Sequence, residues 1–375
     1  MADEIHAVVM PKWGLAMTEG QVVSWLVAPG DAVAPGDELL EIETTKITNV
    51  LEAADAGVLR RQLVGEGETQ PVSSLLGVIA GDGVSDEAID AFIARYQERF
   101  AAQAAAENEA PPEPAIIEVA GQRLRYLEMG GGDGPPALLL HGFGADLNNW
   151  MFNQPALAEN RRVIALDLPG HGGSGKDVGA GTAAGLAAQV AAFMAERGLD
   201  SAHVVGHSLG AAVAAELALA AADRVLSLSL IAPAGLGPEI DGDFIAGFIE
   251  AQRRKQLKPV LSQLVSDASL ITRDMLDDVL KFKRLDGAEA ALRQIAAANF
   301  PEGRQTLDLG ERLAAIDRKT QVIWGRDDQI VPASQAERLP AQVALTLLEG
   351  AGHMPHMEKA GEVNGLLAAF LRDAD

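Results

Sequence analysis

The sequence predicts a two-domain protein: an N-terminal all-β sandwich, or flattened barrel, and a C-terminal α/β domain that carries a helical cap. The first 80 residues alternate apolar and polar positions between glycine and proline turns, which is typical of short antiparallel strands. Beyond residue 115, continuous apolar runs alternate with helical stretches, as expected of a parallel sheet buried on both faces. A proline-rich segment at residues 110–114 predicts an extended linker. We therefore expect domains at residues 1–81 and 116–375, joined by a helix and linker at 82–115.

An internal repeat organises the N-terminal domain. Shifting the segment that begins at Gly20 by 37 positions superimposes apolar on apolar residues and turn glycines on turn glycines: Gly20 on Gly57, Val22 on Leu59, Leu26 on Leu63, Val27 on Val64, Gly30 on Gly67, Leu39 on Leu76 and Ile42 on Ile79. This similarity indicates two β-halves that face each other. Residues 43–49 connect the halves, and Lys46 is expected at the tip of their hairpin. Considered alone, such a lysine is most often an ordinary solvated side chain.

Residues 5–80 resemble the lipoyl domains of 2-oxo-acid dehydrogenase complexes. The matching features are Met10-Pro11, Gly14, Val27 to Asp31, Gly36-Asp37, the hairpin at 41–50 and Gly57. The resemblance implies that a lipoate ligase amidates Lys46 with lipoate. Thr45 replaces the aspartate that many lipoyl domains have before the lysine. Related biotinyl domains have methionine on both sides of the lysine, where Thr45 and Ile47 stand here, so the resemblance favours lipoate over biotin.

A helix is predicted over residues 86–106. Its apolar residues are spaced to share one face, and they are Ile89, Phe92, Ile93, Tyr96 and Phe100. This face either packs against the chain's own N-terminal domain or docks a partner protein.

The C-terminal sheet is predicted from six apolar runs, at residues 137–140, 163–166, 203–206, 225–231, 321–324 and 343–348. Residues 236–310 interrupt this rhythm with consecutive helical segments. We interpret the interruption as an inserted cap.

A nucleophile elbow is predicted at Gly206-His207-Ser208-Leu209-Gly210, because an apolar strand precedes it and an alanine-rich helix follows it. A serine hydroxyl becomes a good nucleophile only with a histidine base that a carboxylate orients. In α/β domains with such an elbow, the acid and then the histidine follow the serine along the chain. Asp327 and Asp328 follow one later strand, and His353 follows the next.

Residues 116–375 resemble the α/β-hydrolase superfamily. The match includes His141-Gly142 after a strand, Trp150, and the segment at 167–174. By motif position the resemblance implies Ser208 as nucleophile, Asp328 rather than Asp327 as acid, and His353 as base. It also implies an oxyanion hole formed by the backbone amides of Phe143 and Leu209.

The remaining histidines are expected to be structural. His141 is expected to shape the turn after its strand, and hydrogen-bonded roles are expected for His6, His171, His203 and His207. The spacing of His353 and His356 would suit a metal ion, but no further histidine or cysteine ligand lies nearby, so no metal site is predicted.

Composition excludes several functional classes. The formal charge of −23 makes nucleic acid and anionic membranes poor partners. No apolar run reaches the roughly 18 residues of a membrane span, and the acidic N-terminus lacks the pattern of a secretory signal. We therefore expect a cytoplasmic protein. The absence of cysteine excludes disulfides, thiolate metal sites and a cysteine nucleophile.

The order of the two domains resembles the acyltransferase components of acetoin-dehydrogenase-type complexes. The usual His-x-x-x-Asp-Gly acyltransferase signature is missing, and residues 86–106 do not resemble a subunit-binding domain. The resemblance implies transfer of an acetyl group from dihydrolipoyl-Lys46 to coenzyme A, either through an acyl-serine or directly. It also implies a thiamine-diphosphate dehydrogenase and a flavin lipoamide dehydrogenase as partners, and a homo-oligomer. Two alternatives stay open: an esterase or thioesterase tethered to a lipoyl carrier, and a non-catalytic scaffold.

Overall fold

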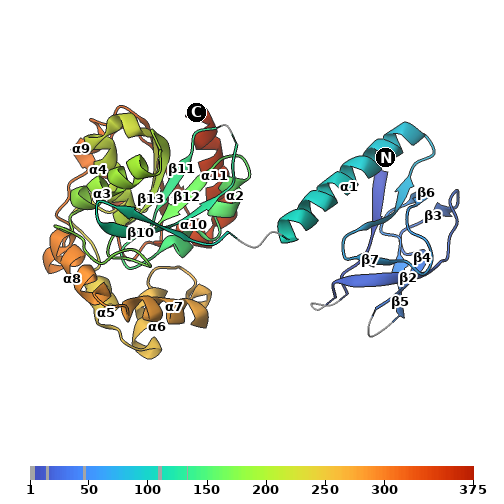
Figure 1. The fold of residues 1–375 in the computed structure, drawn as a ribbon, viewed down its shortest axis with the longest axis horizontal. Helices are drawn as coiled ribbons and strands as arrows, with labels where there is room; N and C mark the ends of the chain where they lie inside the picture. The colour runs from blue at the N-terminus through green and yellow to red at the C-terminus, as the bar shows by residue number, and fades with distance from the viewer. Residues whose placement is uncertain (1–4, 14–16, 45–47, 109–111, 133) are drawn as a thin grey trace. The chain divides into compact units, whose positions relative to one another are not determined.

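The computed structural model describes residues 5–13, 17–44, 48–108, 112–132 and 134–375 (Figure 1). The chain forms two compact units, residues 1–111 and residues 112–375.

The N-terminal unit contains two four-stranded antiparallel sheets. One has the order β1 (Ile5–Val9), β8 (Leu75–Ala80), β6 (Gly57–Gln62) and β3 (Ala32–Val33); the other has the order β5 (Thr48–Glu52), β4 (Glu38–Glu43), β2 (Glu19–Trp25) and β7 (Thr69–Pro71). A shared core lies between them and includes Val22, Leu39, Ile42, Leu59, Leu76 and Ile79. The predicted all-β sandwich is confirmed.

The internal repeat is visible in the packing of this unit. The offset of 37 residues relates β2 to β6 and β4 to β8, which occupy equivalent inner positions in their two sheets. A Cβ atom added to Gly20 would lie 2.8 Å from Ile42, and one added to Gly57 would lie 2.8 Å from Ile79. Because both glycine–isoleucine contacts obey the same offset, the two halves pack in the same way.

Helix α1 (Asp86–Asn108) follows the sandwich and packs on it. Ile89 is fully buried, and Phe92, Ile93 and Tyr96 lie against the same small core as Val78 of β8. The Tyr96 hydroxyl donates a hydrogen bond of 2.9 Å to the Ser73 carbonyl. Of the two alternatives for this apolar face, the structure therefore shows packing on the chain's own N-terminal unit.

The C-terminal unit is built on an eight-stranded sheet. Its order is β16 (Ala344–Leu348), β15 (Lys319–Gly325), β14 (Val225–Ile231), β13 (Ala202–His207), β11 (Ala137–Leu140), β12 (Val163–Leu166), β10 (Gln122–Met129) and β9 (Ala115–Val119). Strands β11 to β16 run parallel and coincide closely with the six predicted runs. The antiparallel hairpin β9–β10 at one edge was not predicted.

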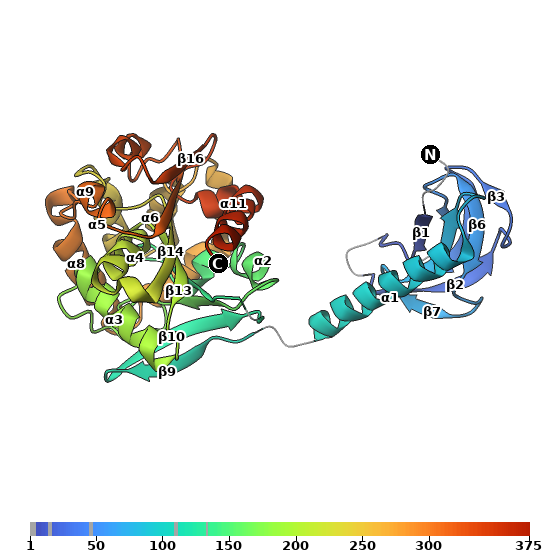
Figure 2. The same ribbon diagram turned by 90° about the horizontal axis from the view of Figure 1, so that it is seen from above.

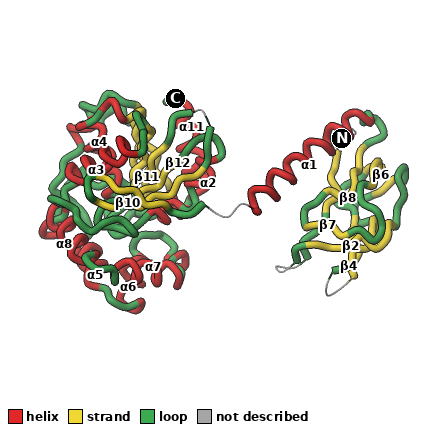
Figure 3. Tube along the Cα trace, viewed as in Figure 1, coloured by secondary structure: helices red, strands yellow, loops and turns green. Residues whose placement is uncertain are grey.

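Helices cover both faces of this sheet, as Figures 2 and 3 show. Helices α3 (Ala183–Glu196) and α4 (Leu209–Ala220) share one core with Leu138 and Leu140, whereas α2 (Gln154–Ala158) and α11 (Ala360–Asp373) share the other with Ala137 and Leu139. Successive strand residues point to opposite faces, so each buried strand contributes to both cores. This explains why the parallel strands are continuously apolar.

The cap is inserted between β14 and β15 and gathers below the sheet in Figure 1. It consists of α5 (Gly242–Glu250), α6 (Arg254–Ser262), α7 (Arg273–Lys283) and α8 (Ala288–Asn299), and the short helices α9 (Gly310–Leu313) and α10 (Pro355–Glu358) follow it along the chain. The predicted α/β fold with a helical cap is confirmed. No helix in the described part of the chain is long and apolar enough to cross a membrane.

Candidate active site

Ser208 occupies a sharp turn between β13 and α4. Its backbone has φ 53° and ψ −115°, a conformation that non-glycine residues rarely adopt. A Cβ atom on Gly206 would lie 2.4 Å from the Gly210 carbonyl oxygen, and one on Gly210 would lie 2.2 Å from the Leu140 carbonyl oxygen. Both glycines are therefore required for the turn to close, and the turn presents the serine hydroxyl at the carboxyl end of the sheet.

Ser208, His353 and Asp328 are brought together by three different loops. Ser208 Oγ lies 2.9 Å from His353 Nε2, and His353 Nδ1 lies 2.7 Å from Asp328 Oδ2. With Nδ1 protonated, His353 donates to the carboxylate and leaves Nε2 to accept the serine proton. The side chains of His353 and Asp328 are 3% and 0% exposed. Burial strengthens these contacts because little water competes for them.

Asp328 rather than Asp327 contacts the histidine. Besides His353, its carboxylate accepts hydrogen bonds from the indole of Trp324 at 2.9 Å and from the amides of Ile330 and Val331 at 2.8 and 3.0 Å. These donors fix the carboxylate. Asp327 is exposed, and its nearest side-chain contact is the Ser266 hydroxyl at 3.5 Å.

Both backbone amides predicted to form an oxyanion hole lie close to Ser208. One belongs to the next residue in the chain, and the other belongs to a loop that packs against the serine. Leu209 is the next residue and begins α4. Phe143 follows Gly142, where an added Cβ atom would lie 3.2 Å from the Ser208 Cβ. Among the described residues, neither amide donates a hydrogen bond to another group of the chain. Phe143 also packs its ring against Phe248 and Phe300 of the cap, with centroids 5.9 and 6.1 Å apart.

A layer of neutral histidines lies behind His353. His207 Nε2 lies 2.8 Å from the His353 carbonyl oxygen, and its ring centroid lies 4.9 Å from that of His353. The rings of His207 and His356 are 4.6 Å apart. Burial, with neighbouring imidazoles, holds the pKa of His207 well below its usual value and lowers the pKa of His356 to about 3. A neutral His207 can donate to the carbonyl and hold the loop that carries His353, a contact that sequence reasoning missed.

The other histidines hold structural hydrogen bonds. His141 accepts from the Leu168 amide at 3.0 Å through Nε2, while its Nδ1 lies 2.8 Å from the Gly142 carbonyl. Burial lowers the pKa of His141 to about 4 and that of His171 to about 3. His203 lies 2.8 Å from the Ser227 hydroxyl, and His6 lies 3.2 Å from Asp55. Within the described ranges, no cluster of three histidines or carboxylates could hold a metal ion.

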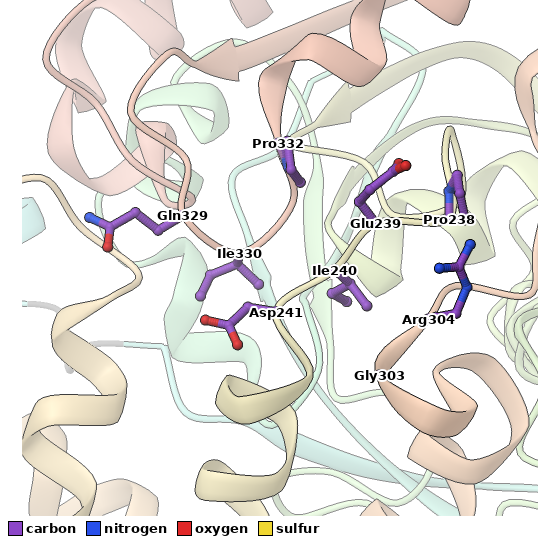
Figure 4. A pocket seen from close by; sticks show the side chains of 9 residues that line it. All are labelled: Pro238, Glu239, Ile240, Asp241, Gly303, Arg304, Gln329, Ile330 and Pro332. Atoms are coloured by element: carbon purple, nitrogen blue, oxygen red, sulfur yellow. The ribbon is translucent and has the colours of Figure 1, made fainter.

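A small open pocket of about 370 Å³ lies beside the loop that carries Asp328 (Figure 4). Ile330 lines this pocket with its side chain while its amide donates to Asp328. Glu239 and Arg304 line it as well and form a β-bridge between the two ends of the cap. Neither Ser208 nor His353 lines the pocket, so we regard it as separate from the serine site.

Lys46, the predicted lipoyl attachment residue, lies outside the described residues. Strands β4 and β5 on either side of it pair in antiparallel register, with Glu43 opposite Thr48. The segment that contains Lys46 therefore connects two adjacent strands of one sheet, so the prediction that it joins the two β-halves was wrong.

Comparisons with known proteins agree with this architecture. Residues 135–360 match the family model for the alpha/beta hydrolase fold, and residues 6–79 match the model for biotin-requiring enzymes, the biotin and lipoyl attachment domain. A meta-cleavage product hydrolase from Pseudomonas fluorescens superimposes with a TM-score of 0.64 at 25% identity, covering 70% of this chain and 98% of that one.

Two curated relatives align over nearly the full length. The dihydrolipoyllysine-residue acetyltransferase component of the acetoin cleaving system from Pseudomonas putida is 48% identical, covering 99% of both chains. Its counterpart from Cupriavidus necator is 46% identical, covering 99% of this chain and 100% of that one. Because both domains and their order are shared throughout, the chain belongs to the family of dihydrolipoyllysine-residue acetyltransferase components of acetoin cleaving systems.

Proposed function

We propose that this acyltransferase moves an acetyl group from a lipoyl arm on Lys46 to the thiol of coenzyme A, with Ser208, His353 and Asp328 as its catalytic residues. The observation that carries the proposal is the hydrogen-bonded chain from Ser208 Oγ through His353 to Asp328. It occurs in a chain that also has a lipoyl-type domain. The match to the biotin and lipoyl attachment model supports lipoate, and Lys46 lies along the chain between the paired strands β4 and β5. When bound, lipoate supplies a dithiol that carries the acyl group as a thioester.

The first half of the reaction uses the serine as nucleophile. Ser208 Oγ attacks the thioester carbon while His353 Nε2 takes the hydroxyl proton. The amides of Phe143 and Leu209 donate to the developing oxyanion. His353 would then return its proton to the leaving sulfur as the carbon–sulfur bond breaks, and Ser208 would keep the acetyl group. An acetyl ester on Ser208 remains.

In the second half, His353 takes the proton of the coenzyme A thiol as its sulfur attacks the ester. Collapse forms the new thioester and restores the Ser208 hydroxyl with the proton from His353. In the direct alternative, the same histidine would deprotonate the coenzyme A thiol for attack on the acetyl group, and no acyl-serine would form. Acid quenching followed by peptide mass spectrometry distinguishes the two routes by the presence of acetylated Ser208.

A hydrolase is the second candidate function. Its support is the 31% identity, over 62% of this chain, to a 2-hydroxy-6-oxononadienedioate/2-hydroxy-6-oxononatrienedioate hydrolase from Cupriavidus pinatubonensis. In that case water would replace coenzyme A as the acceptor.

The proposal includes partners and location. The two relatives of this chain that align over nearly the full length are named as components of an acetoin cleaving system. A thiamine-diphosphate dehydrogenase would reductively acetylate the arm, a flavin lipoamide dehydrogenase would reoxidise it, and a lipoate ligase would attach it. We further propose a cytoplasmic homo-oligomer.

The test follows an acetyl group placed on the lipoylated full chain, with and without coenzyme A. We expect acetyl-coenzyme A from the wild type and a loss of at least about 10³-fold in Ser208→Ala. Lys46→Arg should abolish both lipoylation, measured by intact mass, and transfer from the chain's own arm. Release of free acetate alone would support the hydrolase. Undiminished transfer in Ser208→Ala would contradict Ser208 as the nucleophile. His353→Ala would then test the direct route, because His353 deprotonates the coenzyme A thiol in that route.

A further inference from the structure

A basic segment of the cap stands out against the charge of the chain. Residues 251–284, which include α6 and α7, contain eight lysines and arginines but only four aspartates and no glutamate. The segment thus carries a formal charge of +4 in a chain whose total is −23. Local positive charge in an acidic protein is a site where an anion can gather.

The positive charges surround a hollow of about 830 Å³. Five cations line it, Arg253, Arg254, Lys255, Lys281 and Arg284, together with three carboxylates, Asp274, Asp277 and Asp278. Arg254 and Lys281 are held by ion pairs with Asp277 and Asp278. In contrast, the side chains of Arg253, Lys255 and Arg284 are exposed and have no hydrogen bond or ion pair to any residue that the structure describes. Three cations are therefore available to a ligand.

The start of α6 gives an independent reason to expect an anion. Arg253 is the N-cap of this nine-residue helix, and Arg254 and Lys255 occupy its first turn, which has no acidic residue. The N-terminus of a helix already carries a partial positive charge, so cations there are unfavourable without a counter-charge. A bound phosphate would remove the repulsion and accept hydrogen bonds from the arginines and the free helix amides.

The hollow is connected to the serine site through two cap helices. Phe248 of α5 packs on Phe143, and Gln252 and Arg253, which line the hollow, follow shortly after α5 ends at Glu250. On α7, Phe282 stacks on His171 at 6.3 Å, while the neighbouring Lys281 lines the hollow. The buried ammonium of Lys283 ties the two helices together by donating to the Phe248 and Ala251 carbonyls. The hollow thus lies on the same cap helices that pack around the serine site.

We propose that this hollow binds the adenosine 3′,5′-bisphosphate end of coenzyme A, with Arg253, Lys255 and Arg284 as its phosphate contacts. The inference rests on the proposed function, in which coenzyme A is the polyanionic substrate. The pantetheine arm would then pass the aromatic side chains of the cap and bring its thiol to the serine.

The binding test uses adenosine 3′,5′-bisphosphate with the full chain in isothermal calorimetry. Lys255→Glu and Arg284→Glu should each raise the Kd at least about ten-fold, because a charge-assisted hydrogen bond is replaced by repulsion. Added salt should weaken wild-type binding. Glutamate in the first turn of α6 favours the helix, so Lys255→Glu should not unfold the cap. Arg123→Glu is the matched control, since Arg123 is exposed, lies on β10 and lines neither hollow. Absence of binding to the wild type, or equal Kd values in both cap variants and the control, would overturn the inference.

Transfer kinetics distinguish this inference from the proposed function. Both cap variants should raise the KM for coenzyme A, and the increase should disappear with pantetheine, which has no phosphate. If the wild type acetylates neither thiol while bisphosphate binding follows the prediction, the proposed function fails and the nucleotide site stands. If the wild type acetylates coenzyme A but the variants leave its KM unchanged, the proposed function stands and this assignment fails.

Discussion

Four hydrogen-bond donors hold the Asp328 carboxylate in the position from which it orients His353. His353, Trp324 and two amides all donate to its carboxylate. In Asp328→Asn one of the oxygens becomes an amide nitrogen, which can no longer accept and instead favours the wrong histidine tautomer. We expect kcat for acetyl transfer to fall by about 10³- to 10⁴-fold.

The matched control for this variant is Asp327→Asn. Asp327 is exposed and does not contact His353, so its activity should remain close to that of the wild type. Steady-state transfer from acetylated lipoamide measures both. A comparable loss in the two variants would mean that the carboxylates act together and that Asp328 has no separate orienting role.

The sequence led to the proposed site residues that stand in a motif. It did not indicate residues that come into contact only when the chain folds. Ser208, Asp328 and His353 each follow a strand, and the order of the strands in the chain was enough to propose their roles. The contact between His207 and the His353 carbonyl joins positions 146 residues apart. No spacing indicates such a contact, because it depends on how two loops lie against each other after folding.

The strand–turn–helix element around Ser208 imposes a strict requirement on Gly210. A side chain there would meet the Leu140 and His141 carbonyl oxygens at 2.2 and 2.5 Å, and neither backbone group can move without disturbing β11. We expect Gly210→Ala to lower the free energy of unfolding by about 3 kcal/mol or more. Urea unfolding, or the soluble yield if the variant does not fold, measures the effect.

Gly365→Ala is the opposite case and serves as the control. Gly365 lies exposed in α11, and a Cβ atom there would meet nothing within 4 Å. Alanine has the higher helix propensity, so the variant should be more stable by about 0.5 to 1 kcal/mol. Similar changes of stability in both variants would show that crowding is not the reason why position 210 requires glycine.

Strands buried on both faces were predictable, whereas the edge hairpin was not. β11 and β12 consist entirely of buried apolar residues, which makes a continuous signal. β10 mixes Arg123 and Arg125 with Leu124 and Tyr126, because it lies near the edge of the sheet and is only partly buried. Its alternation is short and interrupted, so the pattern alone did not separate it from a loop.

For the whole chain, net charge predicts which partners are disfavoured but does not locate a local charge concentration. The total of −23 disfavours nucleic acid and anionic membranes. The basic hollow forms only because the start of α6 and the end of α7, some thirty residues apart, meet in the folded cap. A net charge averages over such local concentrations, so only the fold reveals them.

Buried histidines make the stability of the C-terminal unit depend on pH. Burial lowers the pKa of His141 to about 4 and the pKa values of His171 and His356 to about 3, against 6.5 for an exposed ring. Well above pH 6.5 all three are neutral in both states and cause no change. As the pH falls from about 6.5 toward 4, only the unfolded chain takes up protons, so the free energy of unfolding decreases. By pH 5.5 we expect a loss of about 1 kcal/mol for each ring.

His356→Phe tests this contribution, because phenylalanine keeps an aromatic ring against Trp150 but removes the proton site. Between pH 7.5 and 5.5, stability should fall less steeply in the variant than in the wild type. Urea unfolding followed by tryptophan fluorescence measures the stability of the C-terminal unit. Trp13 and Trp25 of the N-terminal unit are changed to phenylalanine in this background, so that only Trp150 and Trp324 contribute to the signal. His6→Gln, in the N-terminal unit, should leave this slope unchanged. Equal slopes in His356→Phe and the wild type would mean that His356 gains its proton in the folded protein as easily as in the unfolded chain, which its complete burial argues against.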